Sequence, residues 1–430
     1  MKKLIQILWK LFLFTFPFSL HSVLYEKATY RFGNFNLWVT GILFLSEIFL
    51  FGIFFLQLFS PLRKSNEVLR IDKSETQTDF SFRPKWSAVE KSIPILLFLF
   101  LLNAALLTFW KGDLWLFGFF LFHLLAGGIF YRLMKAEIIP LKQSIRWLLF
   151  GALFQIIVAF FQVKLNHSLG LHFFGEPHLS SEILNVAKNN LDDGTKVIRG
   201  YGTFLHPNVL GVYLMTLLFV CLPHLKRFSL VLWPAILLLG IYLTGSRAAM
   251  LTTGVLLFLF LFFKFVRGAY LKKVFCFGIL GLFLAINAWF FLNSDKVTVK
   301  STSFAERIEQ NVISQKMFKT HWYGVGVDQF TLTMEEQASR KLKPWNFQPV
   351  HNVYFLVLNE TGFQGLLLLL LMIVFSLKAY FKKESESIAK MLAFFGLLIV
   401  ASFDHLLWTS YMGPLLIGLV LSQVIPKTSK

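Results

Sequence analysis

The sequence predicts an all-α polytopic membrane protein with about twelve transmembrane helices and a long, partly helical outer loop. Of its 430 residues, 56% are hydrophobic and only 15% are charged, whereas about 25% of residues are charged in an average globular domain. The apolar residues form uninterrupted blocks of about 20 residues, which is the length of a helix that crosses a bilayer. Because there are only two cysteines, a secreted domain held by disulfides is excluded as well.

Charged and turn-rich breaks divide the chain into the expected spans. Met1-Lys2-Lys3 and the apolar run after it imitate a signal peptide, but no small-residue cleavage site follows, so we interpret this run as an uncleaved first span. Segment 228–266 is too long for one crossing, and its only polar break is Thr244-Gly245-Ser246-Arg247. This break predicts a tight helical hairpin with Arg247 at a membrane surface. The expected spans are 4–20, 36–59, 93–110, 114–134, 147–163, 203–222, 229–245, 248–266, 274–292, 351–377, 391–409 and 411–425.

The distribution of positive charge predicts the orientation. A net charge of +19 would suggest nucleic acid in a soluble protein, but these Lys and Arg residues lie in short connections between apolar blocks, so no nucleic-acid partner is expected. An even number of spans places both termini on one side, and Lys2, Lys3, Lys427 and Lys430 assign that side to the cytoplasm. The opposite orientation would place the basic segment 60–91 outside.

Two parts follow from this topology. Residues 1–202 comprise N-terminal membrane helices, a cytoplasmic linker at 60–91 and an outer loop at 164–202. Residues 203–425 form a second membrane part that includes the outer loop 293–350. In that loop, Ser303-Phe304-Ala305-Glu306 has capping-box spacing and apolar residues follow at helical intervals, which predicts an amphipathic helix near the membrane surface.

Polar residues gather on the outer side of this topology. Eight of the ten histidines lie at or beyond the outer surface, and charged groups near span ends usually line a polar cavity because burying them in lipid is costly. We therefore expect the functional site at the outer face. The candidates near outer span ends are Arg199, His206, Arg247, Arg307, His351, Asp404 and His405.

The segment Arg199-Gly200-Tyr201-Gly202-Thr203-Phe204-Leu205-His206-Pro207-Asn208 leads into the sixth span, with Pro207 in the first helical turn. Its polar groups therefore converge at a helix N-terminus, which attracts anions. The alternative is a plain loop in which His206 and Asn208 cap the helix. Residue types alone leave both interpretations open.

Arg247 and Arg307 each have a structural alternative. Arg247 is either a substrate contact or an arginine that anchors the hairpin tip at the membrane interface. Arg307 follows Glu306 on the predicted outer helix, where an exposed ion pair is the simplest explanation for it.

His351-Asn352 opens the tenth span directly after the long outer loop. Histidine is the side chain whose unperturbed pKa suits proton transfer near neutral pH, although it is also a common interface residue. Asp404-His405, followed by Trp408 and Tyr411, is typical of an aromatic-belt anchor with an ion-paired histidine.

No metal ligand set or cofactor motif emerges. His167, His172 and His178 are spaced five and six residues apart, no H-E-x-x-H is present, and Asp192-Asp193 is isolated. A Gly-rich nucleotide-binding loop is also missing. We therefore expect neither a metal nor a cofactor.

Four motifs in order resemble the O-antigen ligase and polymerase superfamily. They are R-x-x-G-T-F-x-H-P-N at 199–208, S-R at 246–247, Arg307 leading to G-V-G-V-D-Q-F at 324–330, and H-N-x-Y-x-x-x-x-x-E-x-G-x-x-G at 351–365.

The resemblance covers roughly residues 199–410, and the preceding spans match in hydropathy alone. Phe403-Asp404-His405 to Trp408 also resembles a C-terminal motif found in a subset of the family.

The resemblance implies a membrane glycosyltransferase that moves a glycan from an undecaprenyl diphosphate donor to an acceptor hydroxyl of a lipid, a glycan or a protein. The reaction takes place at the outer face of the cytoplasmic membrane. By motif, the two arginines that bind the diphosphate correspond to Arg247 and Arg307, with Arg340 as a competitor for the second position, and the essential histidine corresponds to His351. Guanidiniums clamp phosphate oxygens without a metal. Arg199, His206, Asn208, Asn352, Asp404 and His405 are the candidates for further substrate contacts.

Several alternatives remain open. Within the superfamily, a ligase, a repeat-unit polymerase and a protein O-oligosaccharyltransferase share these motifs. From another class, a transporter of polysaccharide or lipid-linked oligosaccharide has the same composition, but it would place polar groups near the bilayer midplane in discontinuous helices. A non-catalytic polysaccharide-binding membrane protein is a further alternative.

Overall fold

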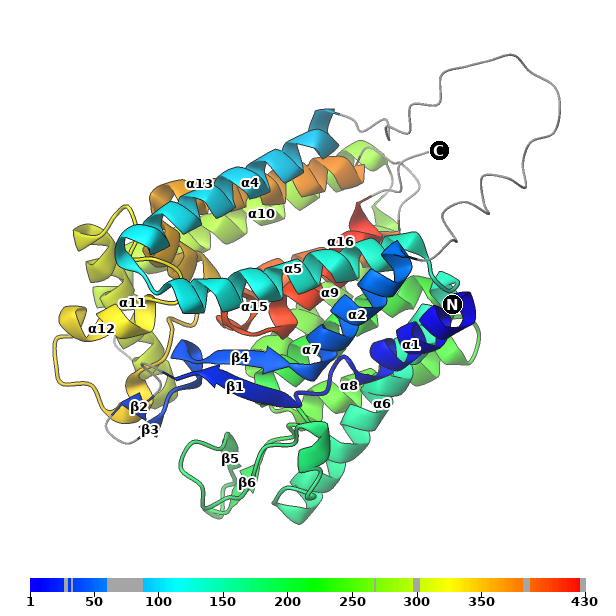
Figure 1. Cartoon of the computed structure of the whole chain (residues 1–430), viewed down its shortest axis with the longest axis horizontal. Helices are drawn as coiled ribbons and strands as arrows, with labels where there is room; N and C mark the ends of the chain where they lie inside the picture. The colour runs from blue at the N-terminus through cyan, green and yellow to red at the C-terminus, as the bar shows by residue number, and fades with distance from the viewer. Residues whose placement is uncertain are drawn as a thin grey trace.

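The computed structural model describes residues 1–26, 30–31, 34–59, 88–266, 268–296, 302–381 and 387–425. Most of the predicted linker 60–91 lies outside these residues, as do Lys427 and Lys430. The described chain is mostly helical, and its long helices run side by side with the start of α1 and the end of α16 at the same end of the molecule (Figure 1). The helices α11 and α12 lie at the opposite end (Figure 1).

The helices follow the apolar blocks of the sequence. They are α1 Lys2–Thr15, α2 Leu45–Leu58, α4 Ala88–Lys111, α5 Leu114–Ala136, α6 Leu141–Leu165, α7 Pro207–Cys221, α8 Ser229–Leu243, α9 Arg247–Phe265, α10 Ala269–Asn293, α11 Thr302–Thr320, α12 Phe330–Gln337, α13 Val353–Phe381, α14 Ile388–Val400, α15 Leu406–Thr409 and α16 Met412–Val424.

Six of the described helices are long and apolar enough to cross a membrane. These spans are Ser92–Lys111, Leu114–Ala136, Leu141–Leu165, Pro207–His224, Tyr270–Lys296 and Val353–Phe381. Five shorter apolar helices accompany them, at Leu45–Leu58, Ser229–Leu243, Arg247–Phe263, Ile388–Val400 and Met412–Val424. The candidate spans indicate a multi-pass membrane protein, but the predicted number of twelve spans is not confirmed.

The prediction of an all-α chain is wrong near the N-terminus. The expected span 4–20 ends as a helix at Thr15, and β1 His21–Tyr25 follows and pairs antiparallel with β4 Gly41–Phe44. The expected span 36–59 is helical only from Leu45 onward, because its first part forms a 3-10 turn and strand β4. A short apolar strand has the same hydropathy as a helical segment, so the sequence pattern did not separate them.

Two more short antiparallel pairs lie outside the helices. Strand β2 Tyr30–Arg31 pairs with β3 Asn34–Phe35, and β5 Lys188–Asn190 pairs with β6 Lys196–Ile198. The second pair lies within the predicted outer loop 164–202.

The helix α7 is at the centre of the fold and packs against α6, α8, α9, α14 and α16. All of its residues except Asn208 are buried, as expected for a helix that is apolar on every side. The neighbouring helix α14 ends at Val400, so the expected span 391–409 is broken at 401–405 before the short helix α15. The start of α7 and this break carry the polar groups described below.

The glycines of the G-V-G and E-x-G motifs serve a backbone junction. Helix α13 is interrupted at Gly362, which has φ of 75° and ψ of 178°. At this break the carbonyl oxygens of Asn359 and Glu360 accept hydrogen bonds from the backbone N–H groups of Val325 and Gly326, both at 2.9 Å. A Cβ atom on Gly324 would lie 2.7 Å from the backbone nitrogen of Gly362. The motif glycines therefore allow the loop between α11 and α12 to attach to α13.

Candidate functional site

The charged candidates from the sequence come together from five places in the fold. Arg199 and His206 precede α7, Arg247 begins α9, Arg307 lies on α11, His351 precedes α13, and Asp404 with His405 forms the break after α14. The electrostatic neighbours of His351 are His405, Asp404, Arg307 and His206. Those of Arg199 include Asp404, Arg247 and Arg307. We call these seven residues the polar cluster.

One side of the cluster is held by a chain of hydrogen bonds that starts at Arg199. Arg199 Nε donates to the carbonyl oxygen of Thr244 (2.6 Å), and its Nη2 donates to Asn208 Oδ1 (2.5 Å). Asn208 Nδ2 in turn donates to Asp404 Oδ2 (2.6 Å). Arg199 and Asn208 therefore connect the α8–α9 hairpin, the start of α7 and the break after α14.

The charge states of Arg199 and Asp404 follow from their surroundings. Burial lowers the pKa of Arg199 to about 10, and the nearby Arg247 and Arg307 add to this effect. Burial alone would raise the pKa of Asp404, but in the acidic range where this carboxyl titrates the charges of His405, His351, His206 and Arg307 outweigh burial and lower its pKa to about 2. Near pH 7, a charged guanidinium and a carboxylate thus lie at the two ends of Asn208.

The predicted hairpin around Arg247 is present. Helix α8 ends at Leu243 and α9 begins at Arg247, with Gly245 between them in the left-handed region (φ 57°). Ser246 caps α9, since its Oγ accepts a hydrogen bond from the backbone N–H of Ala249 (3.4 Å). Arg247 is exposed and has no hydrogen bond or ion pair with any residue that the structure describes.

The predicted outer helix is also present, as α11, and it carries Arg307. The side chains of Ser303 and Phe304 lie outside the described part, so the capping box stays a prediction. The side chain of Arg307 is half-buried and is unpaired among the described residues, so the i to i+3 or i+4 ion pair considered for it is not formed there. Arg340, by contrast, donates from Nη2 to Glu309 Oε2 (2.6 Å) and is 49% exposed. Of the two competing arginines, Arg307 is the one beside His351.

His351 is held from two sides. Its Nδ1 lies 2.7 Å from Gln310 Oε1 on α11. The ring of His405 packs against it with a centroid distance of 5.0 Å and an angle of 67° between the planes, and Trp38 packs against His405 with a centroid distance of 4.5 Å. Burial lowers the pKa of His351 to about 3, and His405 and Arg307 contribute to this. The imidazole is therefore neutral at pH 7 and has a free proton-accepting capacity.

His405 differs from its predicted role. We expected an ion-paired histidine in an aromatic-belt anchor, but His405 Nδ1 bonds to Thr409 Oγ1 (2.7 Å), and Asp404 bonds to Asn208 instead. Of the two aromatic residues of the expected belt, Trp408 donates from Nε1 to Glu360 Oε2 (2.7 Å), while Tyr411 is only 4% exposed. The belt interpretation is therefore wrong, because these side chains face the interior of the fold.

His206 and Asn352 cap helices. The ring nitrogen Nδ1 of His206 accepts a hydrogen bond from the backbone N–H of Asn208 (3.2 Å) at the start of α7. Asn352 Oδ1 accepts from the backbone N–H of Phe355 (3.1 Å) in α13, and its Nδ2 donates to Asn287 Oδ1 (2.8 Å) on α10. Of the two residues in the capping alternative, His206 caps α7, whereas the side chain of Asn208 bonds to Arg199 and Asp404 instead.

Two polar residues of the site were missed in the sequence. Gln310 lies three residues after Arg307, so it shares a helix face with that arginine. Asn287 is a buried amide within an apolar span, and such a residue usually has a specific polar partner. Helical spacing and unexpected polarity were therefore the signals that could have found them.

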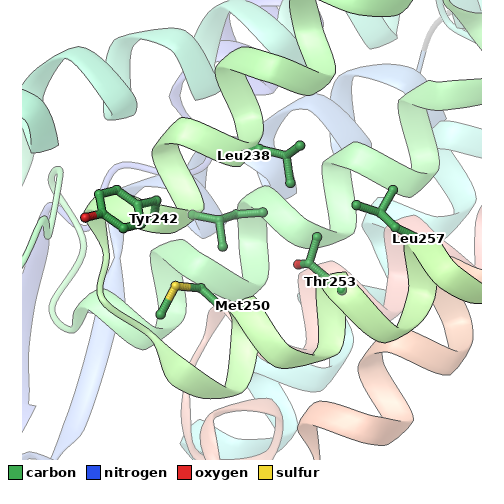
Figure 2. A pocket seen from close by; sticks show the side chains of 7 residues that line it. Leu238, Tyr242, Met250, Thr253 and Leu257 are labelled. Atoms are coloured by element: carbon green, nitrogen blue, oxygen red, sulfur yellow. The ribbon is translucent and has the colours of Figure 1, made fainter.

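An apolar pocket of about 230 Å³ lies between α8 and α9 (Figure 2). Met250, Gly254 and Leu257 follow Arg247 at intervals of three or four residues, which places them on the same face of α9. The pocket is lined by Leu238, Ile241, Tyr242, Met250, Thr253, Gly254 and Leu257. Arg247 therefore lies at the N-terminal end of the face of α9 that lines this apolar pocket.

The comparison with protein families agrees with this arrangement. The sequence model of the O-antigen ligase family matches residues 232–370. No curated protein matches the chain. The matched range includes the α8–α9 hairpin with Arg247, helix α11 with Arg307, and His351-Asn352 at the start of α13. Residues 232–370 of this membrane protein are therefore similar to the O-antigen ligase family.

Proposed function

We propose that the protein transfers a glycan from an undecaprenyl-diphosphate-linked donor to an acceptor hydroxyl at the outer face of the cytoplasmic membrane, with both termini in the cytoplasm. The observation that carries this proposal is the pair Arg247 and Arg307. Neither guanidinium has a partner among the described residues, and both lie near the same half-buried arginine, Arg199. Positive charge that the protein leaves uncompensated at a membrane site indicates an anionic ligand.

A diphosphate suits these two groups. When the bond between the anomeric carbon and the phosphate oxygen breaks, the diphosphate leaves with the electron pair and gains negative charge. A guanidinium binds phosphate oxygens through two parallel hydrogen bonds, and such contacts strengthen as the charge develops. Arg247 and Arg307 would therefore hold the donor and stabilise its leaving group.

His351 is in the protonation state required of a base. Its neutral imidazole would take the proton of the acceptor hydroxyl while the hydroxyl oxygen attacks the anomeric carbon, which inverts that centre. General base catalysis contributes about 10²–10⁴ to a rate. A diphosphate bound between Arg247 and Arg307 would also raise the pKa of His351 toward neutral pH, because it neutralises positive charge beside the ring.

The lipid part of the donor accounts for the apolar pocket. The pocket starts one helical turn from Arg247 and is lined mainly by aliphatic side chains and Tyr242. A polyprenyl chain attached to a diphosphate at Arg247 would place its first isoprene units against Met250 and Leu257. A free sugar nucleotide would leave this surface exposed to lipid.

The central test is transfer by the purified protein in liposomes that contain a lipid-linked glycan. His351→Ala is expected to abolish transfer while expression and melting temperature stay near those of the wild type. His321→Ala is a matched control, since His321 follows α11 and is not among the electrostatic neighbours of His351. Full activity of His351→Ala would exclude the base assignment. Transfer in the presence of EDTA tests whether the arginines act without a metal.

Ligase and polymerase activities differ in what a deletion strain accumulates. Loss of a ligase leaves full-length glycan chains on the lipid carrier, whereas loss of a polymerase leaves single repeat units there. The glycan profile of the deletion strain therefore identifies the acceptor class. A reporter fused after Lys300 tests the orientation, because it is expected to be active only outside the cytoplasm.

A further inference from the structure

The hydrogen bond between His351 and Gln310 has a consequence for the proposed reaction. A neutral imidazole carries its proton on either Nδ1 or Nε2, and a partner of one nitrogen decides which tautomer is present. For His351 the partnered nitrogen is Nδ1, at 2.7 Å from the amide oxygen of Gln310. No other hydrogen bond to this ring is formed within the described part of the chain.

We propose that Gln310 is a positioning residue for His351: its amide oxygen accepts a hydrogen bond from Nδ1–H and so leaves the lone pair of Nε2 free for the acceptor hydroxyl. The proposal rests on the function proposed above. It specifies which nitrogen of His351 takes the proton and which residue determines that choice.

The burial of Gln310 supports this role. Its side chain is 5% exposed, and a buried amide requires hydrogen-bond partners. An amide oxygen has a further property that suits the site. It selects a tautomer as a carboxylate would, but it adds no negative charge that would compete with the diphosphate for Arg307.

Among the described residues around His351, only Gln310 forms a hydrogen bond with the ring, so Gln310 determines the tautomer. The titratable groups that face the ring are His405 and Asp404 from the break after α14, Arg307 from α11 and His206 from the start of α7. His405 packs against the ring with its own Nδ1 engaged by Thr409. His405 thus restrains the plane of the His351 ring, and Gln310 fixes its rotation and its proton.

The placement of Gln310 is itself fixed by α11. Arg307, Gln310 and Ser314 are spaced by three and four residues, so they share one face of this helix. Ser314 Oγ accepts a hydrogen bond from Asn359 Nδ2 on α13 at 2.6 Å, and both residues are fully buried. One helix face therefore carries a donor-binding arginine, the residue that orients the base, and the contact that holds both against α13.

The tautomer can be measured without substrate. The full-length protein labelled with ¹⁵N-histidine is placed in lipid bilayers at pH 7, and its solid-state NMR spectrum is compared with that of His351→Ala to assign the ring of His351. We expect a protonated Nδ1 and an unprotonated Nε2. In Gln310→Leu the signal should move to the other tautomer or to a mixture. A protonated Nε2 in the wild type would overturn the proposal, because the Gln310 amide would then act as the donor.

Kinetics test the consequence for the reaction. Gln310→Leu is expected to lower kcat about 10- to 100-fold with little change in KM for the donor, as is usual when an orienting partner is lost. Gln310→Glu keeps the acceptor and adds a negative charge. It should retain more activity than the leucine variant and move the acidic limb of the pH profile upward, since a carboxylate at Nδ1 raises the pKa of the imidazole.

The matched control is Gln315→Leu. Gln315 lies on the same helix, is 9% exposed, and bonds to the carbonyl oxygen of Leu292 rather than to His351. If both leucine variants lose activity equally, Gln310 has only a structural role and the proposal is wrong. If His351→Ala is fully active while the NMR result holds, the proposed base fails but the assignment of the tautomer stands.

Discussion

Four arginines in and around the candidate site fall into two groups according to what their guanidiniums contact. Arg199 donates to Thr244 and Asn208, and Arg340 forms an ion pair with Glu309. Arg247 and Arg307 have no such partner among the described residues. An arginine whose donors are already satisfied supports the fold, whereas one whose donors are free is available to an anionic ligand. The difference separates the structural side of the polar cluster from the side that we assign to substrate.

Among the variants that test this comparison, Arg307→Ala should have the largest effect. Arg307→Ala is expected to lower kcat by about 10²–10³, because it removes a charged donor aimed at the leaving group. Arg307→Lys should recover only a small part, since an ammonium cannot form the bidentate contact. The measurement is initial-rate transfer in proteoliposomes. Arg340→Ala is the control, and an equal loss in that variant would contradict the distinction between the two groups.

Arg199 should show the opposite pattern, with a large effect on stability. Arg199→Ala removes hydrogen bonds to Thr244 and Asn208, and each bond to a charged group contributes about 1.5–3 kcal/mol. We expect a melting temperature several degrees lower in detergent, with the activity of the remaining folded protein reduced less than in Arg307→Ala. Arg199→Ala with wild-type stability and no activity would instead make Arg199 a third substrate-binding arginine.

The sequence predicted only some of the elements that position these four arginines. The hairpin at Thr244-Gly245-Ser246-Arg247 and the outer helix α11 were predicted because their signals are local, a polar break and a helical apolar period. Strand β4 was mistaken for the start of a helix, because four apolar residues have no recognisable period. Strand β4 pairs with β1, and neither segment alone contains a signal for this pairing.

The roles of the site residues depended still more on distant contacts. The sequence could not separate Arg307 from Arg340, because the choice depends on which of them reaches Glu309 in the folded loop. Gln310 was overlooked for a related reason. A glutamine on an outer helix is ordinary until the structure brings it to His351. Motif spacing could select the candidate residues, but only the fold shows which of them have partners within the described chain.

The pH dependence of stability gives a smaller effect that is specific to the buried histidines. Burial lowers the pKa of His405 to about 4, below its usual value near 6.5. The folded state therefore disfavours the protonated form, and the contribution of His405 is present above about pH 6.5 and is lost as pH falls toward 4. Each such histidine contributes at most about 1.4 kcal/mol per pH unit in this window. Melting curves between pH 7 and pH 4 should fall less steeply for His405→Gln than for the wild type, and equal slopes would contradict the neutral state of this ring.

The smallest expected effect concerns the lipid side of the site. A Cβ atom on Gly254 would meet nothing within 4 Å, so Gly254→Leu can fill the pocket between α8 and α9 without a clash in the backbone. We expect the KM for a lipid-linked donor to rise about 3- to 10-fold, as for a contact of one or two methylene groups, with kcat nearly unchanged. Gly281→Leu on α10 is the matched control, because its Cβ position is equally open and it does not line the pocket. A donor with a shortened prenyl chain should be less sensitive to Gly254→Leu than the natural one. If both leucine variants leave KM unchanged, the lipid chain lies elsewhere, and the assignment of Arg247 then depends on the diphosphate alone.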